Sequence, residues 1–224
     1  MIAVEHAEKS YKGVKVLDDV SLFVPTGCIA GFQGINGSGK TMLMRAICGL
    51  IHLDSGFVKV DGAYIGKDRS FPESVGVLIE GPAFLPAFTG LENLQLIAEV
   101  KGIVTNADVQ EVIERVGLDP SSRKKYKEYS LGMKQRLGIA AAIMEKPDLV
   151  ILDEPTNALD ESGVEMLRGV VRECAARRAT ILLTCHDREF LMSLSDIIFT
   201  MECGKVHGPV RGENGRDEYD ADCS

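Results

Sequence analysis

The stretch Gly34-Ile-Asn-Gly-Ser-Gly-Lys40-Thr41 follows a short apolar run, CIAGFQG at 28–34, and precedes an apolar segment that ends near Gly49. It fits the pattern G-x-x-x-x-G-K-[ST], in which glycines let backbone N–H groups turn toward phosphate oxygens. A helix that begins at Gly39 would direct its positive N-terminal end at the same anion. The sequence therefore predicts a strand, a phosphate-binding loop and a helix in this order.

Each polar side chain of the loop has a role in this interpretation. Lys40 can contact the β- and γ-phosphates of ATP, and the Thr41 hydroxyl can ligate Mg²⁺. The alternative is a glycine-rich turn with a solvated lysine, which the preceding strand and following helix disfavour. We predict that ATP, with Mg²⁺ as cofactor, binds this set of loop residues: Gly34, Ile35, Asn36, Gly37, Ser38, Gly39, Lys40, Thr41 and Met42.

A pair of acidic residues ends another apolar run, LVILDEP at 149–155. In parallel sheets, ligands bind outside the carboxyl ends of the strands, so Asp153 and Glu154 are expected at the edge that carries the phosphate loop. We predict that Asp153 holds Mg²⁺ and that Glu154 activates the attacking water as a general base. The alternative is an Asp-Glu-Pro turn after a strand, which the phosphate loop makes the weaker interpretation.

The remaining pattern predicts an α/β fold. Strands alternate with helices, which favours a mostly parallel core sheet, and VGVLIE at 75–80 is expected to be a buried strand in it. Asp61-Gly62 marks the turn of a small antiparallel β subdomain at 56–66. An inserted helical subdomain is expected over approximately 84–146. The domain would span 1–210, and the acidic segment 211–224 is expected to be a disordered tail.

Composition excludes several classes of protein. The net charge is −8, which disfavours non-specific nucleic-acid binding, so we expect no nucleic-acid partner. The six cysteines form no CxxC pair, and we interpret them as buried or idle thiols in a reducing compartment. Because the chain has no apolar run of 18 residues and an acidic N-terminus, we expect a soluble protein without a membrane span or signal peptide.

Further motifs flank the Asp153–Glu154 pair. Tyr129-Ser-Leu-Gly-Met-Lys-Gln-Arg136 precedes it, and Asn157-Ala-Leu-Asp160 and His186 follow it. This ordered set resembles the ABC ATPases, which are P-loop NTPases with a RecA-like core, over about residues 2–208. The segment at 129–136 resembles the family's signature motif and is far more specific than the phosphate loop alone.

The resemblance implies that two copies pair head to tail around two ATP molecules. Ser130 and Gly132 would then contact the γ-phosphate bound to the opposite subunit, and Asp160 would lie at the dimer seam. His186 would align the attacking water, and Tyr11 would stack on adenine. Each residue also has a simpler interpretation: Ser130 as a helix N-cap, His186 as a loop histidine and Tyr11 as strand packing.

Three positions depart from the usual family pattern. Leu131 replaces the first glycine of the Leu-Ser-Gly-Gly-Gln signature, and Met133 replaces its glutamine. Glu80 stands where the family normally has a glutamine that contacts Mg²⁺, and a carboxylate can also ligate that ion. These changes and the phrase LIEGPAF resemble the subgroup that exports bacitracin and lantibiotic peptides.

The function implied is ATP hydrolysis that powers export through a separate transmembrane permease, at the cytoplasmic face of the membrane. The permease is expected to dock at Pro82, Phe84, Leu85, Pro86 and Phe88, although these side chains could instead cover the subdomain's own core. The main alternative is a soluble ABC ATPase that is not coupled to transport. A nucleotide kinase and a non-hydrolysing regulatory cassette fit the motifs less well.

Overall fold

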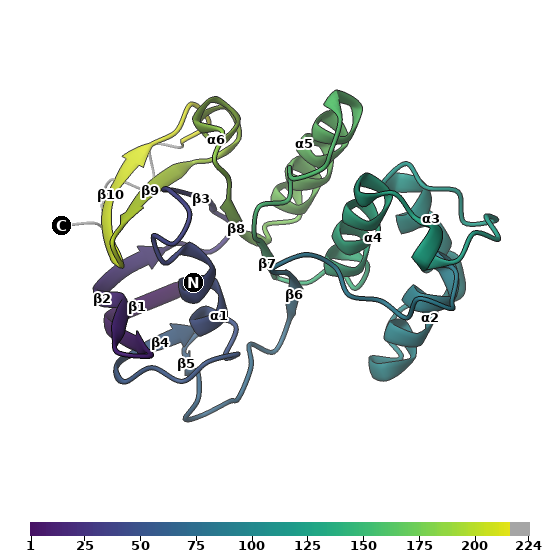
Figure 1. Ribbon diagram of the computed structural model, residues 1–224. Helices are drawn as coiled ribbons and strands as arrows, with labels where there is room; N and C mark the ends of the chain where they lie inside the picture. The colour runs from purple at the N-terminus through teal and green to yellow at the C-terminus, as the bar shows by residue number, and fades with distance from the viewer. Residues whose placement is uncertain (216–224) are drawn as a thin grey trace.

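The computed structural model describes residues 1–215, which form two sheets and a group of helices (Figure 1). The strands in this part of the chain are β1 (Ile2–Tyr11), β2 (Val14–Val24), β3 (Ile29–Gln33), β4 (Ser55–Val60), β5 (Ala63–Tyr64), β6 (Val75–Leu78), β7 (Leu149–Leu152), β8 (Thr180–Thr184), β9 (Ile197–Glu202) and β10 (Lys205–Arg211). The helices are α1 (Lys40–Ile47), α2 (Gly90–Lys101), α3 (Asn106–Arg115), the 3-10 turn η1 (Tyr126–Glu128), α4 (Leu131–Ile143), α5 (Glu161–Ala176) and α6 (Arg188–Leu194).

The core sheet has the strand order β10-β9-β3-β8-β7-β6. Its strands are parallel except β10, which pairs antiparallel with β9. The central strands β7 and β8 are buried along their whole length, as the apolar sequence LVIL and the apolar centre of TILLT predict. Strands β3, β8 and β7 are neighbours, so their carboxyl ends meet at one edge of the sheet.

The second sheet is antiparallel, with the order β2-β1-β4-β5. The predicted turn at Asp61-Gly62 joins β4 to β5, whose Val60 and Ala63 are paired. Apolar residues of this sheet form one core cluster with α1 and one side of the core sheet. The phosphate-loop helix therefore lies between the two sheets.

The helical subdomain consists of α2, α3 and α4, drawn at the right of Figure 1. A capping box fixes the start of α2, because the Thr89 side chain accepts from the Glu92 N–H while the Glu92 carboxylate accepts from the Thr89 N–H. Helix α4 packs directly on β6 of the core sheet: a Cβ on Gly76 would lie 1.7 Å from the Ala142 carbonyl oxygen. Only glycine permits this contact.

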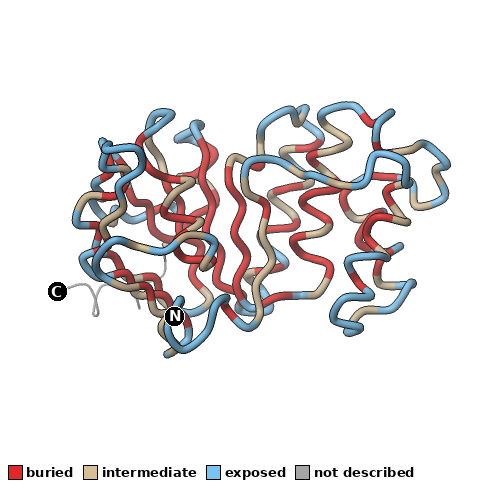
Figure 2. Tube along the Cα trace, turned by 60° about the horizontal axis from the view of Figure 1, so that its bottom comes forward, coloured by how far each residue is buried: buried red, intermediate tan, exposed pale blue. Residues whose placement is uncertain are grey.

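Burial follows the central strands, which are red in Figure 2, while the loops at the periphery are mostly exposed. The expectation of a buried strand at 75–80 is wrong in two respects. Strand β6 ends at Leu78, and its first three residues are only partly buried because β6 is the last strand of its sheet. Its apolar sequence reflects packing on both faces: Leu78 lies in the core cluster that contains α4, and Val75 and Val77 pack against the cluster that contains α1.

The C-terminal boundary differs slightly from the sequence prediction. Strand β10 continues to Arg211, and the Gly212 N–H donates to the Asp196 carbonyl at 2.9 Å. The tail expected at 211–224 thus begins with placed residues, and residues 216–224 lie outside the described part of the chain. Among residues 1–215, each helix is too short or too polar to cross a bilayer.

Cys48, Cys174 and Cys185 are buried as free thiols, which agrees with the interpretation of buried or idle residues. Burial raises the pKa of Cys48 to about 12, so this thiol stays protonated and unreactive at neutral pH. Cys203 is exposed, and Cys223 lies outside the described residues.

Candidate functional site

The predicted phosphate loop joins β3 to α1 and has the backbone that its glycines require. Gly34 and Gly39 have φ values of +151° and +109°. A Cβ on Gly34 would lie 2.3 Å from the Met201 carbonyl oxygen, and one on Gly39 would lie 2.6 Å from the Val16 carbonyl oxygen. The loop is therefore pressed against β9 and β2, and a side chain at either glycine would displace it.

The loop residues divide into an exposed rim and a buried base. Ile35 is 72% exposed, and Asn36 and Gly37 are also exposed, whereas Ser38 is 3% exposed. Within the described residues, the Ser38 hydroxyl has no hydrogen-bond partner. Met42 packs on the core rather than at the rim.

A chain of hydrogen bonds joins the phosphate-loop helix to the ends of β7 and β8. Thr41 Oγ1 donates to Asp153 Oδ2 at 2.7 Å, and Thr184 Oγ1 donates to Asp153 Oδ1 at 2.7 Å. Thr184 Oγ1 in turn accepts from the Glu154 N–H at 2.8 Å. Thr41 and Asp153 were predicted to meet as Mg²⁺ ligands, and the fold brings them into contact. Their hard oxygen atoms suit that ion.

The Glu154 carboxylate is enclosed at the centre of the site. Its Oε1 lies 3.1 Å from His186 Nε2 and 3.6 Å from Lys40 Nζ. Both oxygens are buried, and neither has an aligned hydrogen-bond donor among the described residues, although the two distances place cations beside them. Burial raises the pKa of Glu154, while the charges of His186 and Lys40 oppose the shift. A carboxyl with a raised pKa suits proton transfer near neutral pH.

Lys40 is 5% exposed, and its ammonium lies across the loop. It donates to the carbonyl oxygens of Gly34 at 2.6 Å and Ile35 at 3.2 Å. Together with Glu154 and His186, it completes a compact group from three segments that are distant in the sequence. These segments are the phosphate loop with the start of α1, the end of β7 and the end of β8.

Glu80, predicted as a Mg²⁺ ligand, pairs with a basic residue of the phosphate-loop helix. It follows β6 with a φ of +58°, and its carboxylate forms an ion pair with Arg45 of α1. Its side chain is 57% exposed. The structure therefore joins Glu80 to the phosphate-loop helix through Arg45, whereas Thr41 and Asp153 bond to each other.

The signature residues lie at the start of α4. Ser130 is the N-cap, with its hydroxyl accepting from the Met133 N–H at 3.2 Å, and Leu131 is 72% exposed. A Cβ on Gly132 would lie 2.8 Å from the Ala158 carbonyl oxygen, so this turn and the loop before α5 are in contact. The signature loop thus presents an exposed surface that is joined to the loop at 157–160.

Asp160 is the N-cap of α5 and is held by several donors. Its Oδ1 accepts from the Gly163 N–H at 2.8 Å, from Ser162 Oγ at 2.9 Å and from Arg136 Nη2 at 3.1 Å. Tyr11 ends β1 with its side chain 59% exposed, and it pairs with Val14 across the β1–β2 turn. Val16 of the same hairpin contacts Gly39, so Tyr11 lies on the hairpin that borders the phosphate loop.

Several contacts at the site were not predicted. Gln135 Nε2 donates to the carbonyl oxygens of Glu154 and Pro155, and Thr184 links Asp153 to Glu154. Thr184 could have been noticed as a polar residue that ends a fully apolar strand. For Gln135 and Arg45 the sequence offers no local signal, because each contacts a residue brought near only by the fold.

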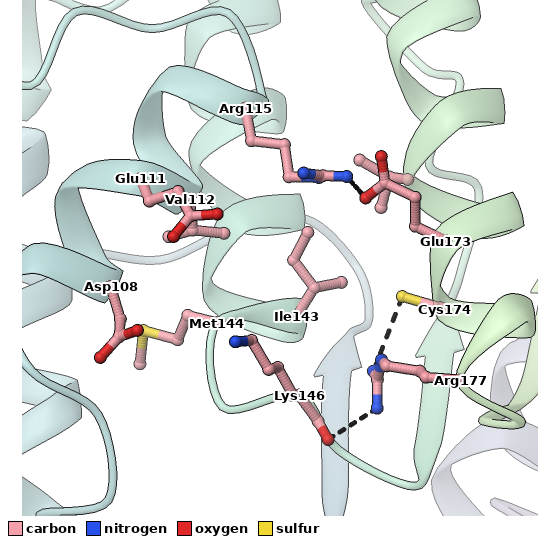
Figure 3. Close-up of a pocket in the computed structure, with 11 residues that line it drawn as sticks. Asp108, Glu111, Val112, Arg115, Ile143, Met144, Lys146, Glu173, Cys174 and Arg177 are labelled. Atoms are coloured by element: carbon pink, nitrogen blue, oxygen red, sulfur yellow. Dashed lines mark hydrogen bonds and ion pairs between the residues drawn. The ribbon is translucent and has the colours of Figure 1, made fainter.

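A separate pocket of about 200 Å³ lies between α3, the end of α4 and α5 (Figure 3). Its lining includes the Arg115–Glu173 ion pair and Arg177, whose guanidinium donates to the Lys146 and Pro147 carbonyl oxygens. Because its lining residues come from these helices and not from the phosphate loop, the pocket is distinct from the candidate nucleotide site.

Comparison with known proteins decides the family. Residues 17–157 match the ABC transporter family. The chain belongs to the ABC transporter family. This ABC ATPase is 44% identical to the uncharacterized ABC transporter ATP-binding protein YybJ of Bacillus subtilis, over 92% of the chain and 94% of the relative. The family and the ATP-hydrolysing activity predicted from the sequence are thereby confirmed.

Two further relatives have named transport functions. The ABC ATPase is 39% identical to the bacitracin transport ATP-binding protein BcrA of Enterococcus faecalis, over 92% of the chain and 68% of the relative. It is 31% identical to the lantibiotic transport ATP-binding protein SrtF of Streptococcus pyogenes, over 92% of the chain and 89% of the relative. The resemblance to this subgroup is therefore confirmed.

Solved structures confirm the P-loop NTPase fold. A dimeric ATP-binding cassette, described as a post-hydrolysis state bound to ADP and phosphate, superposes with a TM-score of 0.86 at 22% identity, over 94% of this chain and 98% of that one. The structure of an ATP-binding subunit of an ABC transporter gives a TM-score of 0.85 at 25% identity, over 94% of this chain and 90% of that one.

Proposed function

We propose that this ABC ATPase hydrolyses ATP with Glu154 as the general base and thereby powers export through a separate membrane chain. The observation that carries the proposal is the enclosed Glu154 carboxylate, which lies between Lys40 and His186 beside the Thr41–Asp153 contact. Among the carboxylates of residues 1–215, Glu154 alone combines burial, a raised pKa and a position next to the phosphate loop.

The phosphates of ATP bind to the loop amides and to Lys40, whose ammonium exchanges the Gly34 and Ile35 carbonyls for phosphate oxygens. Thr41 and Asp153 would hold Mg²⁺ in place of their direct hydrogen bond of 2.7 Å, because a hydroxyl and a carboxylate supply the hard oxygen ligands that this ion prefers. When bound, Mg²⁺ neutralises charge that develops on the phosphates. Thr184 holds Asp153 in place through its second carboxylate oxygen.

Hydrolysis needs a water aligned with the γ-phosphate and an acceptor for its proton. Glu154 accepts this proton, and its raised pKa brings its basicity closer to neutral pH than that of an exposed glutamate. The His186 side chain is 45% exposed, so it has room to rotate. It can thus contact both the Glu154 carboxylate and the γ-phosphate and align the attacking water between them. The remaining catalysis is positioning and charge stabilisation by Lys40 and the loop amides.

Ser130 and Gly132 form half of a second binding surface. The Ser130 hydroxyl accepts one hydrogen bond and keeps its own proton to donate, and it stands at the positive end of α4. We infer that this surface binds the γ-phosphate held by a second copy, with Asp160 at the seam. The dimeric cassette among the similar structures supports this arrangement. Tyr11 then stacks on the adenine of its own subunit's ATP.

The segment at 82–88 is the proposed docking surface for the membrane chain, at the cytoplasmic face of the membrane. Leu85 is 50% exposed and Phe88 is 38% exposed, whereas Phe84 packs edge-to-face on Tyr126 with 5.3 Å between ring centroids. The buried Asn93 holds the segment by bonding to Leu85 N–H and to the carbonyls of residues 85, 88 and 89. Two large apolar side chains on a fixed loop suit a protein partner.

The relatives named for bacitracin and lantibiotic transport support a peptide antibiotic or drug as the cargo. The test is reconstitution of the chain with the membrane protein encoded beside its gene, in liposomes that contain bacitracin or a lantibiotic. We expect ATP-dependent movement of peptide that is lost with Glu154→Gln. If the chain hydrolyses ATP but neither co-purifies with nor is stimulated by such a protein, the transport part of the proposal is wrong.

A further inference from the structure

The backbone of Glu154 has a strained conformation. Its φ is +50°, in the left-handed region that residues other than glycine rarely adopt because of steric strain. Such a conformation persists only where the surrounding structure enforces it. The peptide groups on both sides of Glu154 must therefore be held by other residues.

Two side chains hold these peptide groups. On one side, the Glu154 N–H donates to Thr184 Oγ1 of β8. On the other, Gln135 Nε2 donates to the Glu154 carbonyl at 3.3 Å and to the Pro155 carbonyl at 3.1 Å. Gln135 is only 7% exposed, so its amide is committed to this contact rather than to water.

We propose that Gln135 is a positioning residue for hydrolysis: it fixes the strained Glu154 backbone so that the carboxylate faces the bound γ-phosphate. The inference rests on the proposed role of Glu154 as the base. Gln135 also lies on α4, whose N-cap Ser130 is proposed to contact the nucleotide of the second copy. Helix α4 thereby connects the nucleotide bound to the second copy with Glu154 of the chain to which α4 belongs.

The opposite end of β7 offers a matched contact. Arg177 Nη1 donates to the carbonyl oxygens of Lys146 at 2.6 Å and Pro147 at 2.7 Å, just before the strand begins (Figure 3). Gln135 and Arg177 thus each bond two successive carbonyls that flank the same strand. Only the Gln135 pair adjoins the site, so Arg177→Met is the control for loss of this kind of contact.

The test compares steady-state ATPase kinetics of Gln135→Met and Arg177→Met with the unmodified chain, alongside thermal unfolding. We expect Gln135→Met to lower kcat about tenfold to a hundredfold with KM nearly unchanged, since small displacements of a catalytic group cost about that much. Arg177→Met is expected to lower thermal stability without this loss of kcat. Equal kcat in the two variants would overturn the proposal.

A double-mutant cycle separates positioning from general destabilisation. In a Glu154→Gln background, Gln135→Met is expected to cause no further loss of the residual single-turnover rate, because the group that it positions is already gone. If the rate of the double variant instead falls by the product of the two single-variant losses, Gln135 acts independently of Glu154 and the proposal is overturned. If Gln135→Met does not fold, Gln135→Glu keeps the size of the side chain and removes the donor, and it enters the same cycle.

The two proposals fail in different ways. If Glu154→Gln keeps full turnover, the proposed base is wrong and the role of Gln135 falls with it. If Glu154→Gln is inactive while Gln135→Met hydrolyses ATP like the control, only the positioning role is wrong.

Discussion

The edge of the core sheet and the start of α4 both carry residues assigned to ATP, but their polar groups are used differently. At the sheet edge, Thr41, Asp153, Thr184 and Glu154 are joined in one chain of hydrogen bonds. At the start of α4, the Ser130 hydroxyl makes only a capping bond within residues 1–215, and Leu131 beside it is 72% exposed.

The difference indicates which surface is complete within one chain. The sheet edge is preorganised, so a single copy can bind nucleotide there. The start of α4 has an exposed serine and an exposed aliphatic side chain, as expected of a surface that a second copy completes. The predictions below test this contrast, beginning with the largest effect.

Lys40→Ala and Ser130→Arg are each expected to reduce turnover below about one thousandth of the unmodified rate, because each removes a group that stabilises the transition state. Lys40→Ala also weakens nucleotide binding by the isolated chain, whereas Ser130→Arg leaves that binding nearly unchanged. Fluorescent-nucleotide titration and ATPase assays measure the two effects.

Mixing the same two variants sharpens the test. A mixed dimer contains one composite site with Lys40 from one copy and Ser130 from the other, so part of the activity should return. If Ser130→Arg abolishes binding by the isolated chain as completely as Lys40→Ala, the two surfaces do not act on different ATP molecules.

Glu154→Gln is expected to lower kcat about a hundredfold or more, the scale of a lost general base, while ATP binding is retained. Slow hydrolysis then lets an ATP-bound dimer accumulate, which gel filtration with light scattering detects. The neighbouring Asp153 does not replace the lost base, because its two carboxylate oxygens are bonded to Thr41 and Thr184. Normal turnover in the variant would remove Glu154 from its role.

Phe88→Asp and Phe84→Asp separate docking from packing. Because Phe88 is exposed, Phe88→Asp is expected to leave the melting temperature and the basal ATPase activity nearly unaltered. The new charge is expected to weaken binding of the membrane chain about tenfold or more. Phe84 packs on Tyr126, so its change should lower stability by about 3 kcal/mol. Pull-down with the membrane chain and thermal unfolding provide the measurements. Loss of folding in Phe88→Asp would contradict the docking surface.

The smallest expected effect is on the pH dependence of stability. Burial raises the folded-state pKa of Glu154 above the ordinary 4.5, so the folded state holds this proton more tightly than the unfolded state. Glu154 therefore costs no stability below pH 4.5, and stability is lost as pH rises through the folded pKa. Glu154→Gln lacks this loss.

The melting temperature of Glu154→Gln is thus expected to exceed that of the unmodified chain by more at about pH 8 than at about pH 4. Each kcal/mol corresponds to about 2–4 °C for a chain of this size. If the difference in melting temperature between the two proteins narrows as pH rises, the ionised Glu154 carboxylate is stabilised rather than destabilised by the fold.

Local patterns in the sequence predicted the fold and the residues that the fold brings together beside the phosphate loop. The phosphate loop and LVILDEP each combine a buried strand with the polar residues that follow it, so both the element and its ligand edge can be deduced from one stretch. The turn at Asp61-Gly62 and the Ser130 N-cap are equally local.

Long-range pairings could not be deduced in this way. The role of Glu80 as a metal ligand stays a prediction from the family resemblance, and its pairing with Arg45 depends on how β6 and α1 approach each other. Gln135 and Glu154 are likewise brought together by the packing of α4 against β7. The edge position of β6 also escaped prediction, because VGVL is as apolar as a central strand.

The glycine contacts between α4 and β6 bear on how force passes through the molecule. A Cβ on Gly76 would meet the Ala142 backbone, and one on Gly138 would lie 2.8 Å from Leu78 and Pro82. With so little side chain between helix and strand, there are few rotamers to absorb a displacement. A displacement of the segment that begins at Pro82 should therefore move α4 as a rigid body, because side-chain rearrangement between the helix and the strand can absorb little of it.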